Sequence, residues 1–170
     1  MKRIWVDGER CLGCKSCEIA CAVERNSVSK TLAGAVREAI KPMPRVAVGG
    51  ETGRAFAVQC RHCEDASCIA VCPSGAMHRR ADTGTVAVDA AKCRGCWMCV
   101  MACSFGAVRP LTGFKVAAKC DACVGMVEPA CVAACPTGAL FYGDQDAYRR
   151  VLSARQSRTA RAARTAQLNP

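Results

Sequence analysis

Apolar residues in the first part of the chain occur in short runs between glycine, proline and charged positions. Residues 2–6 and 55–59 are predicted to form short strands. The alanine-rich segment from Cys17 to Glu24 favours a helical turn. A short helix is predicted over residues 30–41, ended by the prolines at positions 42 and 44, and an extended segment begins at residues 45–48.

Residues 76–80 and 85–89 lie on either side of an Asp82-Thr-Gly turn, and this arrangement predicts a β-hairpin. Two further strands are predicted around the last group of cysteines, at residues 114–117 and 140–142.

After Gly143 the sequence is rich in alanine and arginine and contains no cysteine. Residues 144–170 are therefore predicted to form a basic C-terminal arm, helical or partly disordered, outside the main body. We expect the arm to bind an acidic partner surface or a second copy of the protein. Nucleic-acid contact is less favoured, because the arm is poor in aromatic residues.

Sixteen cysteines fall into four groups of four, called quartets below. The third has the spacing C-x2-C-x2-C-x3-C of bacterial ferredoxins, which hold iron–sulfur clusters. In order, the quartets are Cys11, Cys14, Cys17 and Cys21; Cys60, Cys63, Cys68 and Cys72; Cys93, Cys96, Cys99 and Cys103; Cys120, Cys123, Cys131 and Cys135. A repeated frame follows three of them: Cys72-Pro-Ser-Gly-Ala-Met, Cys103-Ser-Phe-Gly-Ala-Val and Cys135-Pro-Thr-Gly-Ala-Leu. The sequence therefore predicts four [4Fe-4S] clusters.

Zinc binding and disulfide formation are the alternative roles for these cysteines. Structural zinc usually takes one close pair of ligands and a second, distant pair. Quartets one and three instead place three thiols within seven residues and a fourth four residues further on, which favours a cluster. A reducing compartment argues against disulfides.

Composition changes the picture of the core and of the charge. The chain is 51% hydrophobic, but sixteen of its residues are cysteine and only 5% are aromatic, so bound clusters are expected to supply part of the folding free energy. The formal charge of +10 would by itself suggest nucleic acid or an acidic membrane. Four oxidised clusters of roughly −2 each would reduce it to about +2. Most of the basic excess is therefore expected to balance the clusters.

No nucleophile–base set, phosphate-binding loop or Rossmann fingerprint is found, so we expect a non-catalytic protein that carries electrons. His62, inside quartet two, is expected to face water rather than to bind metal, and His78 to lie on a strand surface. Trp97 and Met98 are expected either to shield a cluster or simply to pack.

The segment joining quartets two and three has the length of a ferredoxin hairpin, and Pro73 follows the last cysteine of quartet two as in ferredoxins. These two quartets are therefore expected to exchange their fourth cysteines. Quartets one and four would then pair across the intervening segment. Ala22 and Ser104 replace the proline in quartets one and three.

Taken with their neighbours, the quartets resemble the four-cluster iron–sulfur subunits of multi-subunit oxidoreductases over roughly residues 4 to 143. The stretches most similar to the ferredoxin-type subunits of tungsten aldehyde oxidoreductases and carbon monoxide dehydrogenases are Cys11-Leu-Gly-Cys-Lys-Ser-Cys-Glu-Ile-Ala-Cys-Ala-Val-Glu, Gln59-Cys-Arg-His-Cys-Glu-Asp-Ala and Cys93-Arg-Gly-Cys-Trp-Met-Cys-Val-Met. The resemblance implies an α+β fold of two ferredoxin-like double-cluster modules, one inserted in the other, plus a C-terminal helical arm. The outer module would span residues 1–52 and 113–143, the inserted module residues 53–112, and the arm residues 144–170.

The resemblance also implies the ligands of each cluster. Cluster one would take Cys11, Cys14, Cys17 and Cys135; cluster two Cys60, Cys63, Cys68 and Cys103; cluster three Cys93, Cys96, Cys99 and Cys72; cluster four Cys120, Cys123, Cys131 and Cys21.

The function implied is that of an electron-transfer subunit, relaying single electrons between a catalytic subunit and an acceptor subunit. The catalytic subunit is expected to be a tungsten aldehyde oxidoreductase; the alternative is a carbon monoxide dehydrogenase, a formate dehydrogenase or a hydrogenase complex. An iron–sulfur structural or nucleic-acid-binding protein is an alternative of another class. No apolar run approaches the ~18 residues of a membrane span, and residues 1–10 hold no export signal, so a cytoplasmic protein without a membrane span is expected.

Overall fold

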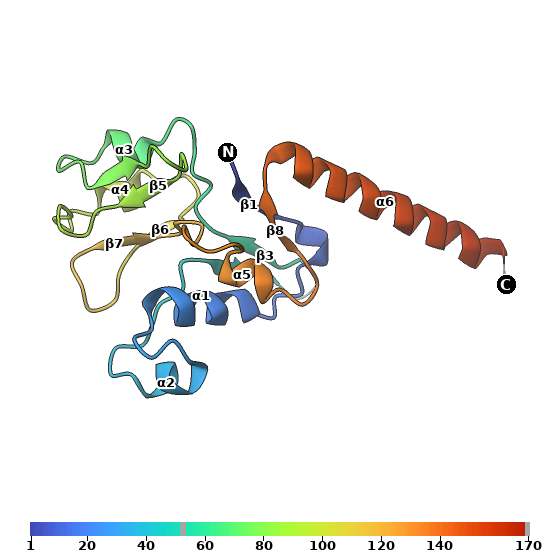
Figure 1. Ribbon diagram of the computed structural model, residues 1–170, viewed down its shortest axis with the longest axis horizontal. Helices are drawn as coiled ribbons and strands as arrows, with labels where there is room; N and C mark the ends of the chain where they lie inside the picture. The colour runs from blue at the N-terminus through green and yellow to red at the C-terminus, as the bar shows by residue number, and fades with distance from the viewer. Residues whose placement is uncertain (52–53, 169–170) are drawn as a thin grey trace.

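The computed structural model describes residues 1–51 and 54–168, and side chains only as far as residue 158. The fold is α+β, with short elements and one long helix (Figure 1). The helices are α1 (Ser16–Asn26), α2 (Leu32–Arg37), α3 (Ser67–Ala70), α4 (Met98–Met101), α5 (Ala130–Ala133) and α6 (Gln145–Leu168). The strands are β1 (Arg3–Val6), β2 (Ala47–Gly49), β3 (Phe56–Val58), β4 (Met77–Arg79), β5 (Val86–Val88), β6 (Val108–Pro110), β7 (Ala117–Lys119) and β8 (Leu140–Gly143).

The described strands form two-stranded antiparallel sheets. β1 pairs with β8, so that Ile4 lies opposite Tyr142 and the first strand meets the strand that follows quartet four. The other pairs are β2 with β3, β4 with β5 and β6 with β7. Isolated two-stranded ribbons are at best marginally stable in water, so these depend on what packs against them.

Two hydrophobic cores organise the molecule. In the first, α1 packs against α5, and the core includes Ile4, Cys21 and Cys131. In the second, α3 packs against α4 beside Met77 and Val86. We call the surroundings of quartets one and four the α1–α5 half, and those of quartets two and three the α3–α4 half. Helices α3 and α4 lie between α1 and α5 in sequence (Figure 1), and the first core also includes Cys60 and Ala107 from the intervening segment.

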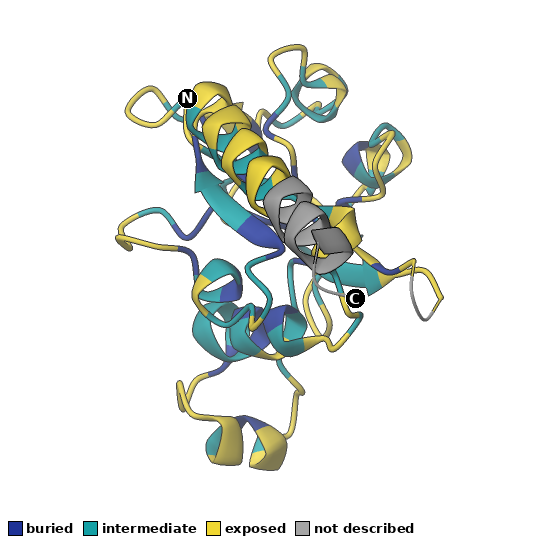
Figure 2. Ribbon diagram, turned by 90° about the vertical axis from the view of Figure 1, so that its right-hand side faces the viewer, coloured by how far each residue is buried: buried dark blue, intermediate teal, exposed yellow. Residues whose placement is uncertain are grey.

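Helix α6 begins on the body and then extends away from it (Figure 1). As far as Arg158, most of its side chains are exposed (Figure 2). The ring of Tyr148 stacks on Trp5 with 5.1 Å between centroids, and its hydroxyl donates to the Val6 carbonyl at 3.0 Å. Arg155 pairs with Asp7 at 3.1 Å. The predicted helix is confirmed. The expectation that the arm lies outside the body is wrong up to Arg155, because the β1–β8 sheet provides an aromatic surface for it.

The predicted strands at residues 2–6, 55–59 and 140–142, the hairpin and the helix after Cys17 are confirmed. The helix predicted over residues 30–41 ends earlier, at Arg37, because Glu38 is extended and its carboxylate accepts the backbone N–H groups of Val28 and Ser29. The strand expected at residues 114–117 was misplaced. A turn precedes it, in which Phe114 N–H donates to Leu111, and β7 begins only at Ala117. The short helices α3, α4 and α5 and strand β6 were not predicted.

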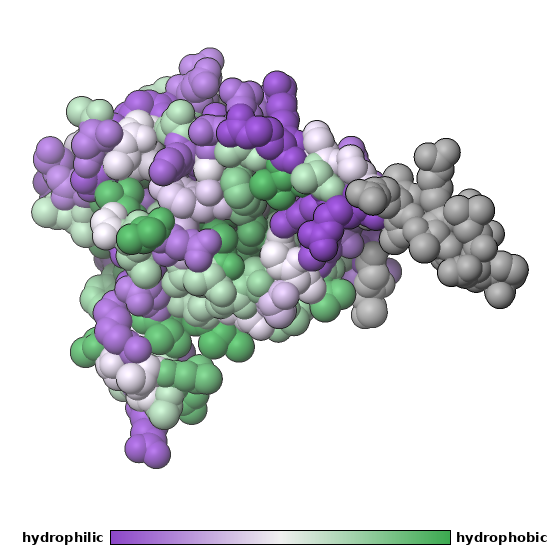
Figure 3. Space-filling model, turned by 45° about the vertical axis from the view of Figure 1, so that its right-hand side comes forward, coloured by the Kyte–Doolittle hydropathy of each residue, from purple (hydrophilic) through white to green (hydrophobic). Residues whose placement is uncertain are grey.

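The α2 segment projects from the body and carries apolar side chains at its surface (Figure 3). Val28, Leu32 and Val36 are all more than half exposed. Clustered apolar surface of this kind is typical of a contact site for another macromolecule. No helix in the described part of the chain has the length and apolar character needed to cross a membrane.

Candidate iron–sulfur cluster sites

In every quartet the chain turns sharply between the first two cysteines. The residue two positions after the first cysteine has a positive φ in each case: Gly13 (69°), His62 (49°), Gly95 (64°) and Ala122 (58°). L-residues rarely adopt this conformation and hold it only where the surroundings enforce it. At His62 and Ala122 the turn points the backbone N–H back at the preceding cysteine sulfur, at 3.4 and 3.3 Å. The four quartets therefore share one local backbone device.

A second shared turn follows the fourth cysteine of quartets two, three and four. The glycine three positions later has a positive φ and donates its N–H to the cysteine carbonyl. The chain then returns, so that Met77 N–H donates to Cys72 Sγ at 3.3 Å and Ala107 N–H to Cys103 Sγ at 3.4 Å. N–H···S bonds of this kind stabilise a thiolate. The repeated sequence frame is thus a structural repeat that directs backbone N–H groups at sulfur.

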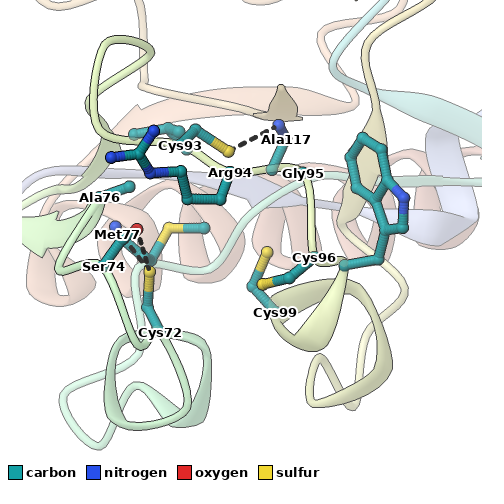
Figure 4. A pocket seen from close by; sticks show the side chains of 12 residues that line it. Cys72, Ser74, Ala76, Met77, Cys93, Arg94, Gly95, Cys96, Cys99 and Ala117 are labelled. Atoms are coloured by element: carbon teal, nitrogen blue, oxygen red, sulfur yellow. Dashed lines mark hydrogen bonds between the residues drawn. The ribbon is translucent and has the colours of Figure 1, made fainter. Parts of the chain in front are cut away.

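One cavity is lined by four thiols from two different quartets. Cys93, Cys96 and Cys99 approach from quartet three and Cys72 from quartet two (Figure 4). Ala117 N–H donates to Cys93 Sγ at 3.5 Å. The four cysteines are those predicted for cluster three.

A second cavity, of ≈ 280 Å³, is also lined by cysteines from quartets two and three. Its cysteines are Cys60, Cys63, Cys68 and Cys103, which is the set predicted for cluster two. Phe105 also lines this cavity, and the Arg61 guanidinium lies over the Phe105 ring at 4.3 Å from its centroid.

The thiols of quartets one and four also lie close to one another, because α1, which carries Cys17 and Cys21, packs against α5, which carries Cys131. The pKa of Cys17 is raised to about 11 by burial and, to a smaller extent, by the charges of Glu18, Cys135 and Cys11. Cys135 also acts to raise the pKa of Cys14. The set predicted for cluster one is Cys11, Cys14, Cys17 and Cys135.

Cys131 lies among the thiols predicted for cluster four. Burial raises its pKa, and the nearby thiolates of Cys120, Cys21 and Cys123 raise it further. Burial also raises the pKa of Cys120 to about 12. Arg45 N–H donates to Cys21 Sγ at 3.2 Å.

Burial raises the pKa values of six buried thiols: Cys17, Cys21, Cys99, Cys120, Cys123 and Cys131. The pKa of Cys14 is instead lowered by its hydrogen bond with the Ser16 hydroxyl. Burial acts to raise the pKa values of Cys72 and Cys135, but hydrogen bonds from following N–H groups and a nearby hydroxyl lower them on balance.

The donor set suits four-iron clusters, since each of the two cavities is lined by four thiols and has backbone N–H groups directed at sulfur. The described residues contain no group of three or more His, Cys, Asp or Glu side chains arranged around a single metal ion.

His62 corrects a sequence expectation. It was expected to face water, yet it is 1% exposed and its Nδ1 accepts the Val86 N–H at 3.0 Å. Burial lowers its pKa to about 3, so the imidazole is neutral. His78 is exposed on β4, as expected, and Trp97 is among the residues that line the cavity shared by Cys72 and quartet three. Sequence reasoning had no signal for the burial of His62 or of Gln59, whose amide donates to the Ile4 carbonyl at 3.1 Å.

A family model described as a 4Fe-4S dicluster domain matches residues 52–145, more than half of the chain. The chain belongs to the 4Fe-4S dicluster family. An iron–sulfur protein of Rhodospirillum rubrum is 40% identical over 91% of this chain and 88% of its own length. The electron transport protein HydN of Escherichia coli is 38% identical over 92% of this chain and 96% of its own. One of the polypeptides of the E. coli anaerobic dimethyl sulfoxide reductase is 38% identical over 86% of this chain and 75% of its own.

Membership of the 4Fe-4S dicluster family confirms the predicted type of cofactor, the [4Fe-4S] cluster. The matched segment contains quartets two, three and four, and quartet one lies before it. The number of clusters and the ligand set of each remain predictions.

Proposed function

We propose that this 4Fe-4S dicluster protein is the electron-transfer subunit of an oxidoreductase complex and relays single electrons through four [4Fe-4S] clusters. The observation that carries the proposal is that two cavities are each lined by four cysteines drawn from two quartets. Relatives named as an electron transport protein and as a polypeptide of a reductase support it. When bound, each cluster supplies a site for one electron.

The protein's own residues orient and tune these sites. Backbone N–H groups such as those of Met77 and Ala107 donate to the ligand sulfurs, which favours the more negative, reduced state. The shared turns hold the thiols in place, and the two packed cores bring the sites close together in one small body. No residue is assigned a catalytic role, since the proposed task is transfer alone.

Cofactor content tests this proposal directly. Anaerobically purified protein should contain about 16 iron and 16 acid-labile sulfide per chain, from about four of each per cluster. Its visible absorption should bleach on reduction with dithionite. A content near eight iron would reject four clusters, and zinc in place of iron would reject the relay.

The exchanged ligand sets are part of the proposal, and Cys72 distinguishes them from a model in which each quartet binds its own cluster. In Cys72→Ala, the spectroscopic signal assigned to Cys93, Cys96 and Cys99 should change. Cys68→Ala is the matched control, because it lies one turn away and should change the other signal. Loss of the same signal in both variants would reject the exchange.

The catalytic partner belongs to the same proposal. From the sequence resemblance, it is a tungsten aldehyde oxidoreductase, with carbon monoxide dehydrogenase, formate dehydrogenase or hydrogenase as the alternatives. The exposed apolar α2 segment and the projecting α6 are the contact surfaces that we assign to partners or to a second copy of the chain. Metal analysis of a complex captured on the tagged chain tests the named partner, because a tungsten aldehyde oxidoreductase requires tungsten and a complex without tungsten would reject it. Truncation after Gly143 should leave the iron content intact but prevent stable assembly, and an undiminished complex on size exclusion would remove the arm from the interface.

A further inference from the structure

Lys119 is a buried cation at the end of β7, directly before Cys120. The residue is 3% exposed, and no ion pair formed by the described residues includes it. Its Nζ donates to two backbone carbonyls, those of Val86 and of Cys120, the latter at 2.7 Å. A buried charge is strongly unfavourable unless an opposite charge compensates it. Neutral carbonyls satisfy the hydrogen bonds of Lys119 but leave its charge without a counter-ion.

Hydrogen bonds connect Lys119 to two different quartets. On one side it bonds to Cys120 of quartet four. On the other, Val86 accepts from Lys119 through its carbonyl and donates its N–H to His62 Nδ1 at 3.0 Å. The N–H of His62 in turn points at Cys60 Sγ of quartet two at 3.4 Å. Lys119 therefore lies between the second cavity and the thiols around Cys131.

Electrostatics agree with this position. Burial raises the pKa values of Cys68 and Cys120, and the Lys119 charge opposes that rise in both. Lys15, Arg61 and Arg94 also stand beside ligand cysteines in the sequence, but all three are exposed, so solvent screens their charges. The carboxylate nearest in sequence, Asp121, is engaged by Arg25 and Arg45.

We propose that Lys119 is the shared counter-charge of the clusters held by Cys60, Cys63, Cys68 and Cys103 and by Cys120, Cys123, Cys131 and Cys21, and that it raises the reduction potential of both. This rests on the proposed function. Each of these sites is negative when loaded, and reduction adds one further negative charge, so a fixed cation between them stabilises the reduced state of either one. Lys119 is thus a positioning and tuning residue at the junction between the two halves of the molecule. It lowers the cost of placing an electron at the point where the relay passes from one core to the other.

The test compares Lys119→Gln and Lys119→Met with Lys115→Gln in the anaerobic, iron-loaded full-length chain. Lys115 is matched because it lies in the same β6–β7 hairpin but is exposed. Redox titration followed by electron paramagnetic resonance resolves the clusters, and Cys68→Ser and Cys123→Ser identify the two signals of interest. At fixed potential, the ratio of reduced to oxidised cluster should fall about tenfold for these two clusters in both Lys119 variants, a shift of about 59 mV for one electron. The other two clusters, and all four in Lys115→Gln, should change less than twofold.

Unchanged potentials in Lys119→Gln would overturn the proposal, and so would an equal shift of all four clusters, which indicates a general charge effect. If the neutral variants lose iron, Lys119→Arg decides the matter. Restored iron content in Lys119→Arg supports a need for the charge, whereas continued loss shows that the lysine acts by packing. Wild-type protein without four clusters would instead reject the proposed function, so the two failures are distinguishable.

Discussion

The two halves of the molecule hold similar thiols in different surroundings. In the α1–α5 half, five of the eight cysteines are buried: Cys17, Cys21, Cys120, Cys123 and Cys131. In the α3–α4 half, the buried ones are Cys60 and Cys99. The local turns are the same in both, so the difference comes from what packs over them. An eleven-residue helix, α1, covers the first set, whereas α3 and α4 have four residues each.

Because of this difference in burial, the two halves should depend to different degrees on bound clusters for their structure. Burial raises the pKa values of Cys120 and Cys131 in the α1–α5 half, so forming these two thiolates is unfavourable until a cluster binds them. Cluster binding and folding should therefore be coupled more strongly there. The more open α3–α4 half should depend less on its clusters for structure.

The largest expected effect comes from removing one ligand in each half. Cys131→Ala should lower the thermal midpoint about 10 °C further than Cys96→Ala. Cys131 is 4% exposed, so removing its sulfur leaves a cavity in the core and lowers the free energy of unfolding by about 3 kcal/mol, whereas Cys96 is exposed. Circular dichroism under anaerobic conditions measures the midpoint. Iron analysis is the control, since both variants should lose a similar amount. Equal midpoints would remove the distinction between the halves.

The thiol pKa values predict a pattern of reactivity in the protein without clusters. At pH 8, iodoacetamide should modify Cys14, Cys72 and Cys135 at least tenfold faster than Cys120 and Cys131, because the first three have lowered pKa values and the last two have raised ones. Peptide mapping by mass spectrometry measures the rates. The same protein in urea is the control, where all cysteines should react alike. Uniform labelling without urea would show that the α1–α5 half does not persist without its clusters.

The same values fix the sign of a stability change with pH. The pKa values of Cys17 and Cys120 are raised from 9.0 to about 11 and about 12. From pH 9.0 up to these folded-state values, the folded state therefore binds more protons than the unfolded state. The stability of the cluster-free fold is therefore greatest below pH 9 and falls as the pH rises through 11 to 12. Denaturation of the cluster-free chain at several pH values checks this.

The ion pairs of the two halves should differ in how much they stabilise the protein, with an effect of intermediate size. Asp121 joins Arg25 and Arg45 around quartet four, and the three side chains are only about a quarter exposed or less. Asp121→Asn should destabilise the protein by about 2 kcal/mol, between the values for exposed and buried pairs. Asp82→Asn is the matched control, because its pair with Arg80 is exposed on the hairpin of the α3–α4 half and should contribute nothing measurable. Equal denaturation midpoints for the two variants would contradict a structural role for Asp121.

How far the sequence predicted these features depends on whether they are local. The quartets, the strand before Cys11 and the hairpin around Asp82 follow from adjacent residues, and the structure contains them. The repeated Cys-x-x-Gly frame is likewise local, and the same glycine turn follows the fourth cysteine in each of its three copies. By contrast, the burial of His62 and Lys119 depends on β5 and β7 meeting at Val86, which no neighbouring residue indicates. The docking of α6 likewise depends on β8 returning to β1, a pairing between the two ends of the body.

The smallest expected effect concerns this last contact. Tyr148 stacks on Trp5 and donates its hydroxyl to the Val6 carbonyl, so it joins the arm to the β1–β8 sheet. Tyr148→Phe keeps the ring but removes this hydrogen bond, which should cost about 1 kcal/mol, or about 2–4 °C in the thermal midpoint. Tyr142→Phe is the matched control on the same sheet, because its hydroxyl bonds to none of the described residues, and it should leave the midpoint unchanged. Cluster spectra should be unaltered in both variants. A shift in the spectra of Tyr148→Phe would mean that the arm supports the thiols of the α1–α5 half directly, while an unchanged midpoint would mean that the stacked rings alone hold the arm in place.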